Sequence, residues 1–328
     1  MSGTIRLIEA SSGSVRIHTE IEERMVERLL KDRRSFVWVD FCEMALERAE
    51  QILREWFDFH PLAIEDALQE QHTPKIDDWD TYVYLVLQDA NLADPDQSIE
   101  VDVFLGANFL VTHSKQPAPA IERLVSAVAS DPRLFQFGPT RLFSSLAGEI
   151  ADNYLHLLDG INEEIEKLEE KLFRDPQPGL LEEAFNLKRN LLHLRRFLGP
   201  QRDVLIKLTR GEYRVIQKPE RVYFRDVSDH FVRLEGLNES LIELTVAARD
   251  TYLSVVNNRL NDVVKILTII TSLFMPLSFL TGFFGMNFFQ PNGLFTGWTG
   301  GAAFALMLLL VFGLPVGMYV WMKRRGWL

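Results

Sequence analysis

The sequence predicts an α/β cytosolic domain, then long helices, and finally a C-terminal hairpin of two membrane-spanning helices. The C-terminal prediction comes from 57 consecutive residues between Lys265 and Lys323 that include no Asp, Glu, Lys or Arg. This stretch far exceeds the roughly 20 apolar residues that span a bilayer core as a helix. The other two predictions come from a change of periodicity near Thr140, where short apolar runs give way to a sustained helical stripe.

The charge balance argues against one class of function. The 328 residues include 46 acidic and 35 basic side chains, for a formal net charge of −11. Affinity for nucleic acid rests mainly on Lys and Arg that neutralise phosphates, so we expect no nucleic-acid partner. Cys42 is the single cysteine, which excludes an internal disulfide and suits a reducing compartment. No secretion signal is recognisable in the first residues, so we expect the body to be cytosolic.

Residues 1–135 are expected to form the α/β domain. Runs rich in β-branched and aromatic residues predict strands at 36–41, 82–88, 101–105 and 109–113. Helical patterns between these runs predict helices at about 43–57 and 62–69.

Residues 136–262 are expected to form a long-helix stalk region. Apolar residues recur there at steps of three or four along one stripe, namely Leu142, Leu146, Ile150, Tyr154, Leu157, Ile161, Ile165, Leu168 and Leu172. The DPQPG break at 175–179 predicts a turn into a second helix at about 180–209. No proline lies between Pro219 and Pro276, so one helix is expected from about 220 to 286, roughly 100 Å at 1.5 Å per residue.

Residues 263–328 are expected to form a transmembrane domain with spans at about 266–286 and 298–322. Only 11 residues separate the two spans, which predicts an antiparallel hairpin. Basic residues flank the outer end of each span, so both termini should face the cytoplasm. The alternative is a buried hairpin of a soluble domain, where charge-free helices of this length are rare.

Two helices per chain cannot enclose a polar path, so a channel would need several copies around an axis. The polar residues lie in the first span, at Thr268, Thr271, Ser272, Ser278 and Thr281, whereas the second span has almost none. We therefore expect the first span to line any pore. Pro276 removes one backbone hydrogen bond inside that span.

The tripeptide Gly285-Met286-Asn287 closes the first span in a specific setting. FMPL at 274–277 and TGFF at 281–284 precede it, and the chain ends on a basic cluster followed by Trp-Leu. Four further segments are similar to sequences of one transporter family and occur in the same order. They are HPLAIED at 60–66, LKRNL at 187–191, YFRDVSDH at 223–230 and residues 252–268. On these motifs the chain resembles the CorA family of divalent metal-ion (magnesium) transporters from about residue 35 to its end.

The resemblance implies a funnel-shaped homopentamer in the lipid bilayer, with a selectivity filter of Gly285, Met286 and Asn287. Five copies of Asn287 would ring the pore entrance and receive hydrated Mg2+. Mg2+ holds its octahedral waters tightly, so amide oxygens can accept hydrogen bonds from that shell without removing it. The structural alternative for Asn287 is a helix C-cap.

Matching the family's pore positions implies a pore face on the long helix that contains the first span. It consists of Asn261, Val264, Leu267, Thr271, Met275, Ser278 and Gly282. Steps of three or four residues keep these positions on one side of a helix. Val264, Leu267 and Met275 would form an apolar constriction that gates by dewetting. Helix packing or lipid contact is the alternative for each apolar position.

The resemblance also implies that Asp66 and Asp250 hold a regulatory Mg2+ between neighbouring cytosolic domains, with Glu65, Asp226 and Asp229 as nearby candidates. Facing carboxylates repel until a cation neutralises them, so internal Mg2+ should favour the closed assembly. The alternative is that these are solvated acids on helix surfaces.

The leading hypothesis is Mg2+ influx through a bacterial inner membrane, driven by the membrane potential and closed by internal Mg2+. The nearest alternative is ZntB-like transport of Zn2+, Co2+ or Ni2+, with or without protons. The loop at 288–297 is uncharged and leaves the cation preference open. The pore face has no His or Cys, the ligands that Zn2+ prefers, which favours Mg2+ mildly.

A second alternative is a membrane-anchored sensor or scaffold that transports nothing. We do not expect an enzyme. The seven histidines form no H-E-x-x-H arrangement, and no glycine-rich phosphate loop is present in the sequence.

Overall fold

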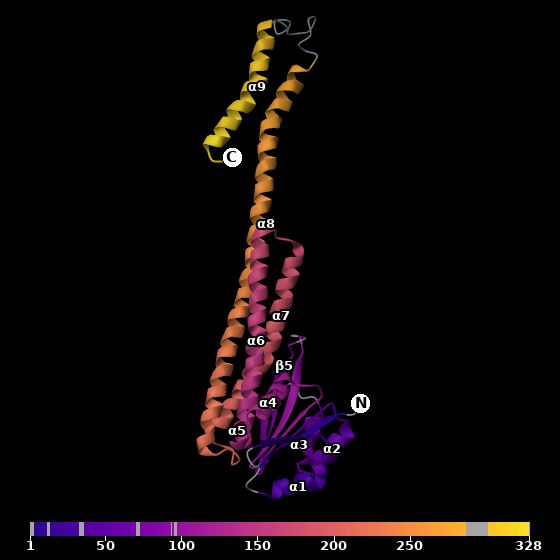
Figure 1. Cartoon of the computed structure of the whole chain (residues 1–328). Helices are drawn as coiled ribbons and strands as arrows, with labels where there is room; N and C mark the ends of the chain where they lie inside the picture. The colour runs from indigo at the N-terminus through magenta and orange to yellow at the C-terminus, as the bar shows by residue number, and fades with distance from the viewer. Residues whose placement is uncertain are drawn as a thin grey trace. The chain divides into compact units, whose positions relative to one another are not determined.

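The computed structural model describes residues 3–11, 14–32, 36–69, 73–92, 94, 97–286 and 301–327. The chain divides into two compact units, Met1–Arg249 and Asp250–Leu328. Figure 1 shows the elements of both units, and each unit is treated by itself below.

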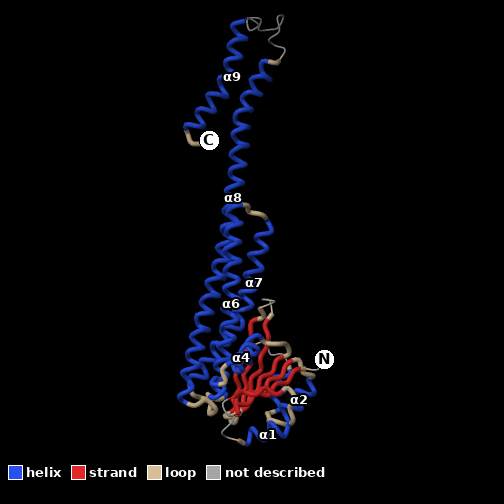
Figure 2. Tube along the Cα trace, in the orientation of Figure 1, coloured by secondary structure: helices blue, strands red, loops and turns tan. Residues whose placement is uncertain are grey.

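The first unit is built on a mixed sheet (Figure 2). Its described strands are β1 (Thr4–Ser11), β2 (Ser14–His18), β3 (Val37–Cys42), β4 (Lys75–Asp78), β5 (Tyr82–Ala90), β6 (Ser98–Gly106) and β7 (Phe109–Ser114). Their order is β2-β1-β3-β7-β6-β5-β4. Among these strands β3 and β7 pair in parallel, with Trp38 opposite Leu110, and the other neighbours are antiparallel.

Helices cover both faces of the sheet. The short helices are α1 (Glu23–Lys31), α2 (Leu46–Glu55), α3 (Pro61–Leu68), α4 (Pro119–Ser130) and α5 (Arg133–Gln136). Helices α1 to α3 share one hydrophobic core with alternate residues of the strands, including Val39, Tyr84 and Phe104. Helix α4 contacts β5 on the other side, as does the longer helix α6 (Pro139–Arg174). Strands β3 and β5 are therefore buried along their whole length.

The predicted α/β class is confirmed, and all four predicted strands and both predicted helices of residues 1–135 are present as β3, β5, β6, β7, α2 and α3. The elements that were not predicted are β1, β2, β4, α1, α4 and α5. Strand β4 has the sequence KIDD, whose three charges hide it from any search for apolar alternation, and it forms by pairing with β5.

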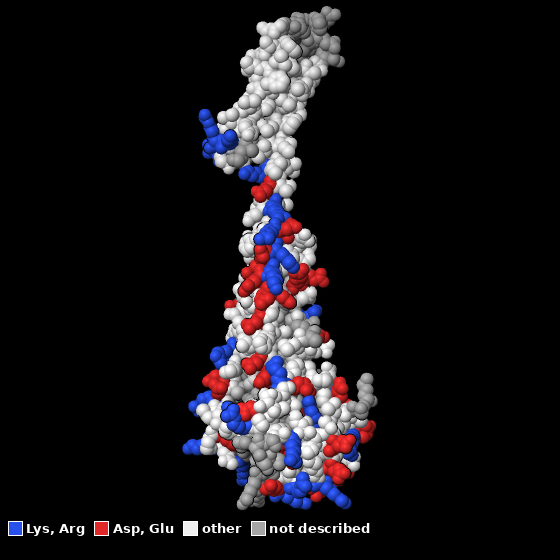
Figure 3. Space-filling model, viewed as in Figure 1, with Lys and Arg blue, Asp and Glu red and all other residues white. Residues whose placement is uncertain are grey.

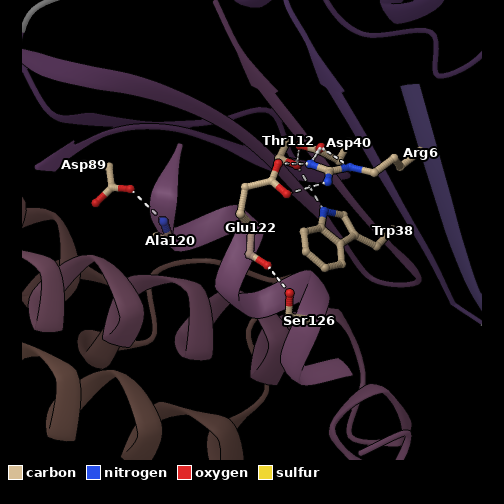
Figure 4. A network of polar contacts seen from close by, with 8 residues as sticks. All are labelled: Arg6, Trp38, Asp40, Asp89, Thr112, Ala120, Glu122 and Ser126. Carbon is tan, nitrogen blue, oxygen red and sulfur yellow. Dashed lines mark hydrogen bonds and ion pairs between the residues drawn. The ribbon is translucent and has the colours of Figure 1, made fainter. Parts of the chain in front are cut away.

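A network of polar contacts fastens α4 to the sheet (Figure 4). Arg6 of β1 binds the buried Asp40 at 2.7 Å and also donates to both carboxylate oxygens of Glu122, at 2.7 and 2.9 Å. The other Asp40 oxygen accepts from the Thr112 hydroxyl at 2.6 Å. Burial raises the pKa of Asp40, and Arg6 opposes that rise. The buried carboxylate is thus fully partnered, as a buried charge must be.

Three long helices complete the first unit, and only the last of them continues beyond it. They are α6, α7 (Pro178–Arg210) and α8 (Arg221–Phe284), the last preceded by a 3-10 turn at Lys218–Glu220. All nine residues of the predicted apolar stripe are buried in α6, which confirms that stripe as core. Burial of each large apolar side chain contributes about 1.5–3 kcal/mol. Gly211 ends α7 in the left-handed conformation at φ 81°, where a side chain would be strained.

The predicted pair of apolar C-terminal helices is also confirmed. Helix α8 continues through the first predicted span to Phe284, and α9 (Gly301–Arg324) covers the second. Each holds a window with mean hydropathy of at least 2.0 in which no residue is buried. On the face seen in Figure 3, the described surface of this apolar region is white, and blue basic side chains lie at its end. Both helices are long and apolar enough to cross a membrane.

Candidate ion pathway and cation-sensing site

The predicted pore face lies on one uninterrupted helix. Its residues all belong to α8, and each is exposed in the single chain. At 100° per residue they fall within about one third of the helix circumference. Met275 is 67% exposed and Leu267 is 62% exposed, so the described residues of the chain leave large apolar side chains on this face uncovered.

Thr271 supplies a polar group in the middle of this face. Its hydroxyl donates to the Leu267 carbonyl at 2.8 Å. The hydroxyl proton is therefore used inside the helix, and the lone pairs of the oxygen remain available as acceptors. A hydrated cation presents only water hydrogens, so an acceptor is the group that suits it.

Two of the three predicted filter residues lie at the end of α8. The Gly285 N–H donates to the Thr281 carbonyl at 2.9 Å, and a Cβ built on Gly285 would lie 2.9 Å from that same oxygen. This close approach favours glycine at position 285. Met286 follows with 46% of its surface exposed. The predicted Asn287, the loop at 288–297 and residues 298–300 of the second predicted span lie outside the described residues.

Trp and Arg side chains gather at the end of α9. The Arg325 guanidinium lies 5.8 Å from the centroid of the Trp321 ring, and the Trp327 ring lies 6.4 Å from that ring. Amphipathic rings beside basic residues are typical of the boundary between lipid and water.

Asp66 is positioned by the short helix α3. Pro61 occupies the first turn, and the Nδ1 atom of His60 accepts from the Leu62 N–H at 3.2 Å, which caps the helix. The Asp66 carboxylate is about one-third exposed and lies 2.5 Å from the Nζ atom of Lys75 on β4. This partner was not predicted, because Lys75 belongs to β4, a strand that its own composition does not indicate.

Lys75 bridges two carboxylates. Its Nζ atom also lies 2.9 Å from Asp77 and 5.3 Å from the centroid of the Tyr84 ring. Burial lowers the pKa of Lys75, but the hydrogen bonds to Asp66 and Asp77 outweigh it, so the net direction is upward. Lys75 is therefore a stably charged ammonium in contact with a predicted metal ligand.

The remaining predicted ligands occupy different elements. Glu65 is exposed beside Asp66 on α3 and accepts from the Gln69 side chain at 3.1 Å. Asp226 and Asp229 are exposed near the start of α8. Asp250 is exposed at the first residue of the second unit. At 1.5 Å per residue, Asp229 and Asp250 are separated by roughly 30 Å along one helix, so they cannot share an ion within one chain.

The predicted ligands do not gather into one cluster. Within the described residues of one chain, no group of three or more His, Cys, Asp or Glu side chains could hold a metal. Mg2+ keeps several waters and binds through one or two carboxylates, so the prediction for Asp66 and Asp250 requires that two chains supply the pair.

The fold and the apolar helices define an integral membrane protein with a large soluble domain, in which one 64-residue helix carries both the soluble packing and the first span. The family model for the CorA-like Mg2+ transporter protein matches residues 33–324. The chain therefore belongs to this family of divalent-cation transporters.

Curated relatives match along nearly the whole chain. The chain is 32% identical over 311 residues to YfjQ of Bacillus subtilis, covering 94% of this chain and 95% of that protein. It is 31% identical to the cobalt/magnesium transport protein CorA of Thermotoga maritima, covering 98% of this chain and 92% of that protein. It is also 28% identical to the zinc transport protein ZntB of Pectobacterium carotovorum, covering 82% and 81%.

Solved structures share the fold. The complete CorA magnesium transporter from Methanocaldococcus jannaschii superposes with a TM-score of 0.81 at 23% identity and covers 99% of each chain. This likeness supports the arrangement of soluble domain, long helices and apolar helix pair.

Proposed function

We propose that this chain forms a homopentameric Mg2+ channel in a bacterial inner membrane, with both termini in the cytoplasm. The observation that carries the proposal is the pore face of α8, which is exposed in the single chain and leads directly to Gly285 and Met286. Five such faces around one axis would enclose a path. The membrane potential would drive the cation inward, and no catalytic step is assigned to the chain.

The filter in this proposal is the ring of Asn287 at the end of the first span, supported by Gly285 and Met286. Amide oxygens would accept hydrogen bonds from the waters of Mg2+. Thr271 and Ser278 would offer further acceptors on either side of the apolar ring of Met275. The apolar rings of Val264, Leu267 and Met275 would close the path by excluding water.

Regulation in this proposal lies in the soluble domains. Asp66 of one chain and Asp250 of its neighbour would hold internal Mg2+, with Glu65, Asp226 and Asp229 nearby, and the ion would supply charge neutralisation between facing carboxylates. The proposed division is a soluble domain at 1–135, a stalk at 136–262 and a transmembrane domain at 263–328.

A second candidate is ZntB-like transport of Zn2+, Co2+ or Ni2+, favoured by the similarity to a zinc transport protein. The absence of His and Cys from the pore face favours Mg2+ only mildly, since a hydrated ion needs no direct ligand. A sensor that transports nothing is the third candidate.

Flux into liposomes containing the purified full-length protein tests the proposal. We expect Mg2+ influx that follows the membrane potential and is independent of a pH gradient, compared with Zn2+, Co2+ and Ni2+. The substitution Asn287→Ala should reduce the Mg2+ flux, whereas Asn162→Ala, an exposed position on α6, should leave it unchanged. Undiminished flux through Asn287→Ala would refute the filter assignment. Zn2+ flux that requires a pH gradient would favour the second candidate.

A further inference from the structure

The ammonium group of Lys75 already occupies a cradle that a regulatory cation would need. It contacts the carboxylates of Asp66 at 2.5 Å and Asp77 at 2.9 Å, and it lies over the Tyr84 ring. Strand β4 and helix α3 supply the two sides of this cradle, so the contact joins elements that are otherwise separate in the sequence.

The cradle is partly open to solvent. The side chains of Lys75 and Asp66 are 29% and 31% exposed, so a cation can reach the Asp66 carboxylate from outside. A divalent cation that arrives there meets a positive charge in direct contact with its ligand. It must either displace the ammonium or share the carboxylate against electrostatic repulsion.

We propose that Lys75 is an intramolecular competitor of the regulatory divalent cation at Asp66 and thereby sets the internal cation concentration at which the channel closes. This inference rests on the proposed function, because it requires that Asp66 senses an internal cation. The competition lowers the affinity of Asp66 for the divalent cation. The channel then closes only when the internal concentration of the cation rises, and not at its basal concentration.

The simpler reading is that Lys75 only links α3 to β4. The two readings predict opposite behaviour when the charge is removed. A purely structural link predicts that Lys75→Met loosens α3 and weakens cation sensing or leaves it unchanged. Competition predicts that Lys75→Met strengthens cation sensing.

The test compares variants of the full-length protein with two readouts. The first is the internal Mg2+ concentration that halves the flux in liposomes. The second needs no flux and is the Mg2+ concentration that gives half of the thermal stabilisation of the detergent-solubilised protein. The variants are Lys75→Met, Lys75→Arg, which keeps the charge, and the matched control Lys167→Met, whose ammonium pairs with the exposed Glu163 at 3.4 Å on α6.

We expect Lys75→Met to lower both half-effect concentrations by about tenfold, which corresponds to about 1.4 kcal/mol. Lys75→Arg should stay near the wild type, and Lys167→Met should not change either value. On the Asp66→Asn background, Lys75→Met should have no further effect, because the contested ligand is gone.

An unchanged or raised half-effect concentration in Lys75→Met would overturn the inference, as would an equal shift in Lys167→Met or a shift that persists without Asp66. A wild-type protein that shows no Mg2+ dependence in either readout would refute the proposed regulation itself and this inference with it. A wild type that responds to Mg2+, with the same half-effect concentrations in Lys75→Met, would overturn the inference and leave the proposed regulation standing.

Discussion

The Asp89 carboxylate at the end of β5 accepts a 2.8 Å hydrogen bond from the backbone N–H of Ala120, the second residue of α4. Its other oxygen accepts from the Asn153 side chain of α6 at 2.7 Å. One buried acid therefore joins a strand, a helix N-terminus and a long helix. A negative charge at a helix N-terminus is favourable, but burial away from water opposes that charge.

Burial raises the pKa of Asp89 to about 6, against hydrogen bonds from Ala120 and Asn153 that lower it. The folded state therefore holds a proton that the unfolded state has already lost, and stability falls as the pH rises from about 4 to 6. We expect the wild type to lose up to about 3 kcal/mol over this range relative to Asp89→Asn, several degrees in the melting temperature. Thermal unfolding of both proteins between pH 4 and 7 measures the difference, and parallel pH profiles would contradict it.

Arg6 is expected to be the costliest charge to remove from the soluble domain. The substitution Arg6→Met leaves Asp40, which is 1% exposed, without its counter-ion. Loss of one partner of a buried ion pair costs about 3–5 kcal/mol. Urea unfolding should show this loss, and a second substitution, Asp40→Asn, should recover part of it. Arg54→Met, which breaks an exposed pair on α2, should change little, and equal losses in both arginine variants would contradict the assignment.

Thr271 and Thr281 make the same kind of bond to a backbone carbonyl four residues earlier, at 2.8 and 3.0 Å, but only Thr271 belongs to the proposed pore face. We expect Thr271→Val to reduce Mg2+ flux by about fivefold or more, because a hydrogen-bond acceptor contributes about 1 kcal/mol. Thr271→Ser should retain the flux. Thr281→Val is the matched control, and equal reductions in both valine variants would argue against the proposed face.

Charge reversal tests the proposed cation-sensing pair. Asp66→Lys combined with Asp250→Lys should raise the internal Mg2+ concentration that halves the flux, since two attractive charges become repulsive. Glu163→Lys combined with Glu170→Lys applies the same charge change to exposed positions of α6. Unchanged inhibition in the aspartate pair would place the sensor elsewhere, and Asp226→Lys with Asp229→Lys would then be examined.

Periodicity predicted the parts of the fold that depend on local pattern. The stripe from Leu142 to Leu172 specified α6 because every third or fourth residue had to be apolar to meet its neighbours. Helix α4 could have been found as well, since Pro119 at its start precedes apolar residues at helical spacing. Strand β4 could not, because pairing with β5 rather than its own composition makes it a strand.

The candidate site divides in the same way. Positions on one helix, such as Thr271 and Met275, follow from spacing, because a helix fixes which residues share a face. The contact between Lys75 and Asp66 joins a helix to a strand nine residues later. Sequence spacing alone does not predict that these two side chains meet, because that depends on the path of the chain between the helix and the strand.

The parallel pairing of β3 with β7 imposes an order on biosynthesis. Val37 pairs with Phe109, so one edge of β3 has no partner during translation until β7 has been synthesised, roughly 70 residues later. The middle of the sheet is thus completed after its β4–β6 edge, while the first apolar span is still more than 100 residues from being translated. Closure of the sheet can therefore precede insertion into the membrane, and the exposed edge of β3 is the segment most in need of protection until then.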